Sequence, residues 1–275
     1  MFVKVRPFVM ICWHTRGMDD AVPAGIEPAD WERARRLVAA ADRVAVLTGA
    51  GISTDSGIAD FRGPKGVWTK NPGAEKLSTL EHYLESEEAR RRAWQARLTS
   101  PVWDARPNAG HEALVALERA GRLHTLVTQN IDGLHVEAGH DDSLVVEVHG
   151  NARRVRCWDC ESEASMEEAL ERVRAGEHDP PCRDCGGILK STTVLFGESL
   201  PDGAMERAVE AAVEADVVLA VGTMLSVYPV ASMIHVAERA GTPVVVLNGQ
   251  PTELDHLADV VLLGSISEVL PLLLS

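Results

Sequence analysis

The sequence predicts an α/β protein: a doubly wound, Rossmann-like parallel sheet that carries an inserted small zinc-ribbon module. Three observations lead to this fold class. Short runs rich in Val and Leu alternate with segments of helical periodicity along most of the chain. The alternation stops between residues 152 and 190, where charged residues and four cysteines replace the apolar periods. A glycine-rich turn ends the first apolar run, as in nucleotide-binding sheets.

The first half of the chain begins with a predicted helix. Glu27-Pro28-Ala29-Asp30 opens it, and Trp31, Ala34, Leu37 and Val38 then fall at helical spacing. A short apolar strand, of the kind that is buried in a sheet, is predicted next, at 43–48. Residues 64–77 are rich in Gly, Pro, Lys and Asn and are predicted to form a loop. Helices are predicted at 78–99 and 108–120.

The second half of the chain contains most of the predicted strands. The alternation of strands and helices, and its interruption at 152–190, predict two domains. Strands are expected at 124–128, 143–148, 193–196, 217–221, 243–247 and 260–263, with helices at 202–214, 229–239 and 266–274. We therefore expect a disordered N-terminal tail at 1–25, of which residues 1–17 are either disordered or an over-extended start. A Rossmann-like domain is expected at 26–152 and 191–275, with a helical and loop insert near 64–105. The zinc-binding module is expected at 153–190.

Composition and charge narrow the classes of partner. The 275 residues are 45% hydrophobic, enough for one large domain with an insert. The formal charge of −14 comes from 41 acidic and 27 basic residues, and such a surface repels nucleic acid and anionic lipid. It suits lysine-rich partners, although a negative charge also simply maintains solubility. No apolar run approaches the roughly 20 residues of a membrane span, and residues 1–17 make a poor signal peptide. The expected compartment is the cytoplasm.

Four of the five cysteines form two CxxC pairs, at Cys157 and Cys160 and at Cys182 and Cys185. Each pair lets two thiolates reach one ion from a tight turn, and two pairs complete a tetrahedron. Four sulfur ligands leave no open coordination position, so the Zn²⁺ would be structural. Two redox CxxC motifs or plain buried thiols are the alternatives. Cys12 has no assigned role.

The turn after strand 43–48 reads Gly49-Ala50-Gly51-Ile52-Ser53-Thr54. A glycine-rich strand-to-helix turn lets backbone N–H groups approach a pyrophosphate. The spacing is nevertheless not GxGxxG, because Thr54 stands where the third glycine belongs. No acidic residue ends a second strand in the usual dinucleotide-binding position. An ordinary dehydrogenase is therefore disfavoured, and a purely structural turn stays open.

Further motifs follow in a fixed order, and together they resemble the sirtuin family in its bacterial form. They are Gly57-Ile58-Ala59-Asp60-Phe61-Arg62-Gly63, Thr128-Gln129-Asn130-Ile131-Asp132-Gly133-Leu134-His135, Val148-His149-Gly150-Asn151, Phe196-Gly197-Glu198, Gly222-Thr223 and Asn248. The resemblance covers roughly residues 30 to 270, with the cysteines in the expected interval. Taken singly, Asn130 and Asp132 also suit helix caps, and His149 a buried structural histidine.

The resemblance implies an NAD-dependent protein-lysine deacetylase or deacylase. The acyl-lysine carbonyl oxygen would attack C1′ of the nicotinamide ribose, with His149 as general base on a ribose hydroxyl. Deacylated lysine, nicotinamide and O-acyl-ADP-ribose are the implied products. Two alternatives are a protein ADP-ribosyltransferase at the same NAD site and a non-catalytic zinc-ribbon and nucleotide-sensing module. The second would need loss of Asn130, Asp132 or His149, and all three are present.

The same resemblance assigns the site residues. Catalytic roles fall to His149, Asn130 and Asp132, and structural zinc binding to the four paired cysteines. NAD binding is implied for Gly49, Ala50, Gly51, Ser53, Asp60, Phe61, Arg62, Gln129, Asn130, Ile131, Asp132, Gly222, Thr223, Met224, Asn248 and Ile266. The acyl-lysine substrate would contact Val194, Phe196, Gly197 and Val227. Its peptide would add as a strand between the two domains.

Acyl preference depends on the segment around Trp94 and Arg97. Desuccinylating sirtuins carry a Tyr-x-x-Arg pair here, whereas this chain has tryptophan three residues before arginine on one helical face. Arg97 would still pair with an acyl carboxylate, but an indole lacks the phenol hydroxyl. Arg97 as part of a solvated basic run, 90–97, is the alternative. We expect deacetylation as the main activity. Met224, where the family commonly has serine, and Ser191-Thr192-Thr193, in place of an Arg-Pro pair, are departures that affect cofactor affinity and substrate preference.

Overall fold

The computed structural model describes residues 22–60 and 79–275, and within these ranges the larger sheet has six parallel strands. The strands are β1 (Val44–Thr48), β2 (Leu123–Thr128), β3 (Val145–Glu147), β7 (Val217–Val221), β8 (Val244–Asn248) and β9 (Val260–Leu263). Their order is β3-β2-β1-β7-β8-β9. The strand order reverses between β1 and β7, which is the switch point where doubly wound sheets bind ligands. The predicted fold class is confirmed.

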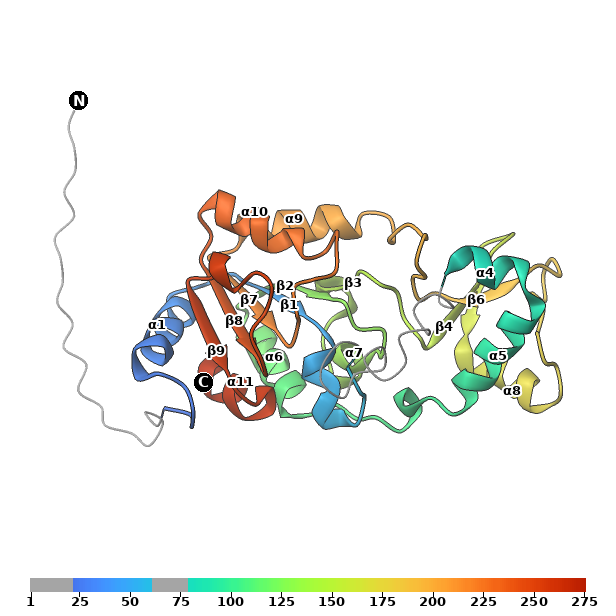
Figure 1. Ribbon diagram of the computed structural model, residues 1–275, viewed down its shortest axis with the longest axis horizontal. Helices are drawn as coiled ribbons and strands as arrows, with labels where there is room; N and C mark the ends of the chain where they lie inside the picture. Colours follow the sequence, from blue (N-terminus) through green and yellow to red (C-terminus); the bar gives the residue numbers. More distant parts are fainter. Residues whose placement is uncertain (1–21, 61–78) are drawn as a thin grey trace, which may run out of the picture.

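Both faces of this sheet are covered by helices, which explains why its strands are continuous apolar runs. All five residues of β1 are buried; Val44 and Val46 point to one core, Ala45 and Leu47 to the other. The first core is closed by α1 (Pro28–Ala39), α6 (Ala109–Arg119) and α11 (Ile266–Leu274). The second is closed by α9 (Ala204–Glu214) and α10 (Ser232–Ala240), which run along the top of Figure 1.

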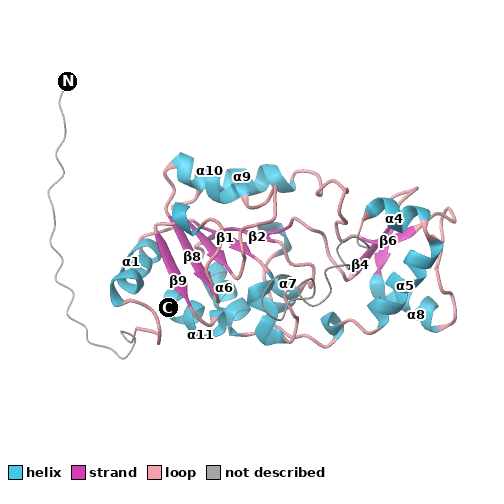
Figure 2. Ribbon diagram, in the orientation of Figure 1, coloured by secondary structure: helices cyan, strands magenta, loops and turns pink. Residues whose placement is uncertain are grey.

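The small module lies at the other end of the molecule (Figure 2) and is built from two separate segments of the chain. Its antiparallel sheet has the order β5-β4-β6, from Glu163–Ser165, Arg154–Cys157 and Leu189–Ser191. The helix α8 (Met166–Arg174) packs on this sheet, and so do α4 (Leu80–Glu85) and α5 (Glu87–Leu98) from the preceding segment. Trp94 of α5 is fully buried in the module core, and the Tyr83 hydroxyl donates to the Leu189 carbonyl at 2.8 Å.

The elements differ from the sequence predictions in several places, and the three short strands β4, β5 and β6 were not predicted. The helix expected at 78–99 is two helices, because Ser86 ends α4 and caps α5 by accepting from the Ala89 N–H at 3.2 Å. The strand expected at 193–196 is absent from the described segment, where Phe196 makes only a single bridge to Thr79. The helix α8 was not predicted, although its buried residues fall at helical spacing: Met166, Ala169, Leu170 and Val173.

The described ranges contain no helix with the length and apolar content needed to cross a membrane. The short helix α7 (Leu134–Ala138) follows β2, and a 3-10 helix (Ala50–Ser56) follows β1. Both leave the carboxyl edge of the sheet, where a large cavity opens.

Candidate active site

A cavity of about 1070 Å³ lies at the carboxyl ends of β1, β2, β7 and β8, against the segment that returns from the small module. This is the edge where open α/β sheets bind ligands. Most of the residues predicted for the site line it. They are Gly49, Ala50, Gly51, Asp60, Gln129, Asn130, Ile131, His149, Val194, Phe196, Gly197, Gly222, Thr223, Met224, Val227, Asn248 and Ile266.

The glycines of the first turn are required by a contact between two backbones. The Gly51 N–H donates to the Gly222 carbonyl at 2.8 Å, so the turn after β1 lies directly against the turn after β7. A Cβ on Gly51 would lie 2.7 Å from Gly222 Cα, and one on Gly49 would lie 2.8 Å from the Gly222 oxygen. Only glycines permit this approach, which forms the floor of the cavity. The structural and ligand-binding interpretations of the turn are thus compatible.

Replacing Gly222 by alanine should destabilise the protein by at least about 2 kcal/mol. Gly222 has φ +64°, and an added Cβ would overlap the Ile52 nitrogen and the Gly51 carbonyl carbon. Chemical unfolding measures the loss. Gly249→Ala is the matched stability control, because that glycine is on the same cavity wall but has open space around its Cα. Equal stability of the two variants would contradict the proposed backbone contact.

Asn130 and Asp132, which follow β2, form one hydrogen-bonded group with Ser53 of the 3-10 helix after β1. The Asn130 Nδ2 donates to the Gly49 carbonyl at 3.2 Å and to Ser53 Oγ at 3.1 Å. Ser53 Oγ donates to Asp132 Oδ2 at 2.7 Å, while Asp132 Oδ1 accepts from the Leu134 N–H at 2.9 Å. Burial raises the pKa of Asp132 above its ordinary value. Asn130 therefore meets the cavity directly, whereas Ser53 and Asp132 lie behind it and hold its amide.

His149 follows β3 and reaches the same cavity. Its Nδ1 lies 3.1 Å from the Gln129 carbonyl oxygen, which can only accept a hydrogen bond. Nδ1 must then carry the proton, and Nε2 is left with a free lone pair. Burial lowers the pKa of His149 below its ordinary value. The ring is thus neutral at pH 7 and able to accept a proton, as a general base must.

At the other end of the cavity, polar side chains connect the ends of β2, β7 and β8. The Gln129 Nε2 donates to Thr223 Oγ1 at 2.8 Å. The Gln250 Nε2 lies 3.0 Å from Met224 Sδ, and Asn248 Nδ2 donates to the Gln250 carbonyl at 2.8 Å. The Met224 sulfur is a weak hydrogen-bond acceptor, whereas a serine hydroxyl at this position would also donate. This wall therefore has one hydrogen-bond donor fewer than it would have with serine.

Six of the predicted residues are not among those that line the cavity: Ser53 and Asp132 lie behind Asn130, and four more lie elsewhere or outside the described ranges. Phe61 and Arg62 fall outside the described residues. Trp94 and Arg97 are not among the residues that line this cavity. Trp94 is fully buried, and the Arg97 guanidinium lies over the Tyr83 and Trp94 rings at 5.9 and 5.2 Å. Arg97 is not part of a solvated run either, because its Nη1 is shut off from solvent within the small module.

The sequence analysis missed several cavity residues that a simple topological rule identifies. Gly249 and Gln250 follow β8, and Gly264 and Ser265 follow β9. All four come directly after a parallel strand, so the carboxyl-edge rule predicts them once the strands are placed. The neighbours of the predicted Val227 also line the cavity, and their sequence carries no such signal: Leu225, Ser226, Tyr228 and Pro229.

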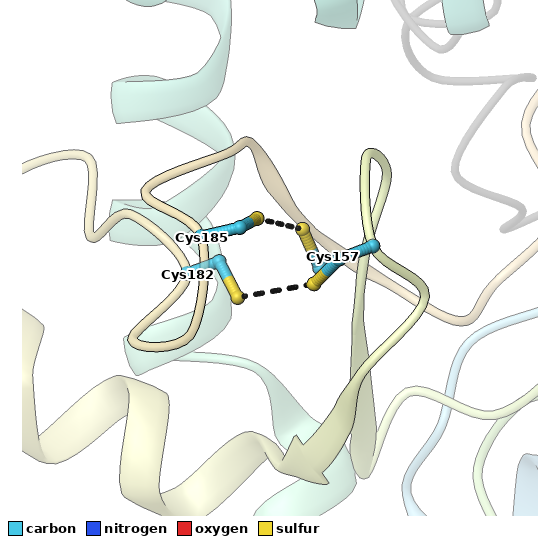
Figure 3. Close-up of side chains that lie close together, drawn as sticks. Cys157, Cys182 and Cys185 are labelled. Carbon is cyan, nitrogen blue, oxygen red and sulfur yellow. Dashed lines mark hydrogen bonds between the residues drawn. The ribbon is translucent and has the colours of Figure 1, made fainter.

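The four paired cysteines meet in one cluster, with all four sulfur atoms within 4.8 Å of one another (Figure 3). Cys157 Sγ lies 3.5 Å from Cys185 Sγ, and Cys160 Sγ lies 3.7 Å from Cys182 Sγ. These separations are too long for disulfides of about 2.05 Å. They are close to the about 3.8 Å between ligands of a tetrahedral ion with Zn–S bonds of about 2.3 Å.

Backbone N–H groups also point at these sulfur atoms. Asp159 N–H donates to Cys157, Asp184 N–H to Cys182 and Gly187 N–H to Cys185, each at 3.4 Å. Such bonds stabilise thiolates and not thiols, so the donor set fits a structural Zn²⁺. The cluster bridges the turn after β4 and the turn before β6, which holds the small module together.

Three buried histidines predict a loss of stability in acid. The ring of His135 lies 5.0 Å from that of His111 and 5.8 Å from that of His140, centroid to centroid. Each ring has one buried nitrogen without a partner among the described residues, and Glu118 is the carboxylate that faces them, through His140. Burial lowers the pKa of all three, that of His111 to about 4.

Because the unfolded chain binds these protons near pH 6.5 and the folded protein does not, stability is full above pH 6.5 and falls below it. For His111 alone the loss by pH 4 is on the order of 3 kcal/mol. Urea unfolding from pH 7.5 to 5 measures the slope. The free energy of unfolding should fall more steeply with acid in wild type than in His111→Gln. Both proteins contain the same cysteine cluster, so acid effects at that cluster cancel in the comparison. Parallel slopes would refute the expectation.

Comparisons with known proteins agree with this geometry. Residues 49–229 match the Sir2 family. An NAD-dependent protein deacetylase 2 of Streptomyces coelicolor is 48% identical over 231 residues, which are 84% of this chain and 96% of that protein. A structure described as "Structural Basis for the Mechanism and Regulation of Sir2 Enzymes" superimposes with a TM-score of 0.80 at 35% identity, covering 90% of this chain and 97% of its own. A "Sir2-p53 peptide-NAD+" structure superimposes with a TM-score of 0.76 at 31% sequence identity, and the match covers 86% of this chain and 93% of that chain.

Proposed function

The chain belongs to the Sir2 family, and from this premise we propose that it is an NAD-dependent protein-lysine deacetylase. The observation that carries the proposal is His149, a neutral histidine with a free Nε2 in the same cavity as the Asn130–Ser53–Asp132 group. A general base beside a pocket that binds an amide is what transfer of an acyl group to a ribose hydroxyl requires. NAD is consumed as co-substrate and supplies the ribose that receives the acyl group.

The wall residues divide the cavity between the two substrates. Asn130 and Ile131 would receive the nicotinamide, with Asp132 and Ser53 holding the Asn130 amide in place. Gln129 and Thr223 would bind ribose hydroxyls, and Met224 and Asn248 would border the adenosine. Asp60 and the backbone of Ala50 and Gly51 belong to the same NAD side, as does Ile266.

The acyl-lysine side chain would enter between Val194, Phe196, Gly197 and Val227. Phe196 is 40% exposed at the cavity, an unusual exposure for an aromatic ring that a bound aliphatic chain would reduce. The peptide backbone would pair as an added strand along the same segments, since side-chain pockets alone give little affinity for varied sequences. Protein substrates with acylated lysines are thus the proposed partners.

Incubation with NAD and an acetyl-lysine peptide tests the proposal. Nicotinamide release must be stoichiometric with deacetylated peptide and O-acetyl-ADP-ribose, as measured by mass spectrometry. The alternative activity, protein ADP-ribosylation, would instead yield a peptide carrying ADP-ribose. The homologues named as deacetylases do not favour that alternative. Nicotinamide release that does not depend on the peptide would refute deacetylation.

Acetyl groups should be preferred over succinyl groups, because Arg97 is packed against the Tyr83 and Trp94 rings in the small module. The prediction is that Arg97→Met leaves the ratio of succinyl to acetyl turnover unchanged, even where stability falls. Kinetics on the two peptides with both enzymes measure this ratio. Succinyl turnover that exceeds acetyl turnover and collapses in Arg97→Met would make Arg97 a specificity residue.

The proposed compartment is the cytoplasm. Four cysteines that converge at distances suited to metal binding need a reducing environment, because an oxidising one would favour disulfides. Cell fractionation with an antibody to the chain tests this directly.

A further inference from the structure

The segment from Ser191 to Leu200, here the channel segment, forms one wall of the active-site cavity. It leaves the small module at the end of β6 and lines the cavity from Thr193 to Leu200. Beyond β6, three backbone bonds attach it to its surroundings, and in the first the Thr192 N–H donates to the Arg154 carbonyl at 3.0 Å. The Val194 N–H donates to the His149 carbonyl at 2.9 Å, and the Leu80 N–H donates to the Phe196 carbonyl at 3.0 Å. After Ser191, which ends β6, the single bridge at Phe196 is its only regular pairing, so side chains must hold its shape.

Lys190 supplies the first half of such a restraint. Its side chain is only 5% exposed, although it carries a charge. The Nζ donates to the Ser191 carbonyl at 2.8 Å, to the Thr193 carbonyl at 2.7 Å and to Glu198 Oε2 at 2.9 Å. All three ammonium protons are therefore used, and all three acceptors belong to the channel segment.

Glu198 supplies the other half. The same Oε2 that receives Lys190 also accepts the Leu195 N–H at 2.9 Å. The Glu198 N–H in turn donates to the Leu195 carbonyl at 3.0 Å, which closes a turn around Phe196 and Gly197. The ammonium and the carboxylate thus clamp the channel segment at Ser191 and Thr193 on one side and at Leu195 and Glu198 on the other.

Net stability does not explain a charge pair in this position. Removing two charges from water offsets most of their attraction, and apolar replacements of buried pairs are often no less stable. What a buried pair does determine is geometry, because both partners must meet their acceptors. Here that geometry is the shape of the wall carrying Val194, Phe196 and Gly197. Lys190 itself does not line the active-site cavity; it borders a second, more polar cavity of about 770 Å³ on the other side of the segment.

We propose that Lys190 and Glu198 are positioning residues that hold the channel segment in the shape that receives the acyl-lysine peptide. The inference rests on the proposed deacetylase function and adds two residues to its peptide side. The NAD side of the cavity lies on the ends of β1, β2, β7 and β8, which this ion pair does not contact. Loss of the pair should therefore weaken peptide use and leave NAD binding as it is.

The test is steady-state kinetics on full-length Lys190→Met and Glu198→Gln with an acetyl-lysine peptide. Loss of charge-assisted hydrogen bonds should raise KM for the peptide by about tenfold or more, with kcat at saturating peptide within a few-fold of wild type. ADP-ribose affinity, measured by calorimetry, should not change. The double variant should be no worse than the poorer single variant, because both substitutions break one interaction.

Arg90→Met is the matched control. Arg90 and Asp179 form a comparable ion pair in the small module, with the side chains 12% and 17% exposed and 2.8 Å between Nε and Oδ2. Its loss should lower thermal stability without raising the peptide KM. If Lys190→Met fails to fold, the isosteric Glu198→Gln still decides the question.

Wild-type peptide KM in a folded Lys190→Met or Glu198→Gln enzyme would overturn the inference. An equal loss of ADP-ribose affinity would overturn it as well, because the effect would then be general. Failure of the proposed function gives a different result: wild type itself would release no nicotinamide with any acyl-lysine peptide.

Discussion

Replacing His149 by alanine should lower deacetylation by about 10²–10⁴-fold, the range that a positioned general base supplies. The reason is the single free lone pair on Nε2, since Nδ1 donates to the Gln129 carbonyl. Alanine removes the proton acceptor but none of the hydrogen bonds of the Asn130–Ser53–Asp132 group. ADP-ribose affinity should therefore stay near that of wild type, and the melting temperature should change little.

The pH profile gives a second measurement on the same residue. Burial lowers the pKa of His149 below 6.5, so the neutral, active form is lost only as the pH falls below that value. The kcat/KM of wild type should thus rise with pH and reach its plateau by about pH 7. His124→Ala, a histidine of β2 paired with Glu214 at 3.4 Å, is the control and should keep wild-type kinetics. Substantial turnover in His149→Ala would refute the assignment.

Removing one zinc ligand should have the largest effect on stability. Structural zinc sites contribute about 10–16 kcal/mol in isolated zinc-finger peptides, more than the whole stability of most domains. Cys182→Ser should therefore leave the small module without its tertiary structure. Activity should fall as well, because the channel segment begins at β6 of that module.

Metal analysis and fluorescence can follow this change. Wild type should carry about one zinc per chain, and Cys182→Ser should carry none. The ring of Trp94 is fully buried in the module core, so its emission should shift to the red when the core opens. Cys12→Ser is the matched cysteine control and should retain zinc. A stable, active Cys182→Ser enzyme would show that the cysteine cluster is not a structural metal site.

Much of the fold could be predicted because its strands carry their own signal. Strands β7 and β9 were predicted with their observed bounds, since a strand covered on both faces is a continuous apolar run. The strand expected at 193–196 was wrong for the same reason: Val194 and Phe196 are apolar, but they serve a cavity wall and not a sheet. An apolar run indicates that a segment is buried. Whether the segment is buried in a sheet or in another structure depends on the neighbouring elements.

The site follows the same division. Asn130 and His149 were predicted from motifs, and they do line the cavity because each motif comes directly after a strand of the parallel sheet. Trp94 and Arg97 were assigned to the acyl group because they resemble the Tyr-x-x-Arg pair of desuccinylating sirtuins. Spacing places two side chains on one helical face, but it does not predict the surface against which that face packs. In the folded protein that surface is the small module, not the cavity.

The sequence by itself therefore determined the architecture of the sheet, the cysteine quartet and the residues at the strand ends. Each of these is a local property, set by neighbours within a few positions along the chain. Only the tertiary structure decided that α4 and α5 belong with the zinc module and that Gly222 must be glycine. It alone showed that Lys190 and Glu198 form a buried ion pair on the segment from Ser191 to Leu200. These features depend on contacts between residues that are far apart in the sequence. A buried charge or a close contact between two backbone segments exists only once the chain has folded.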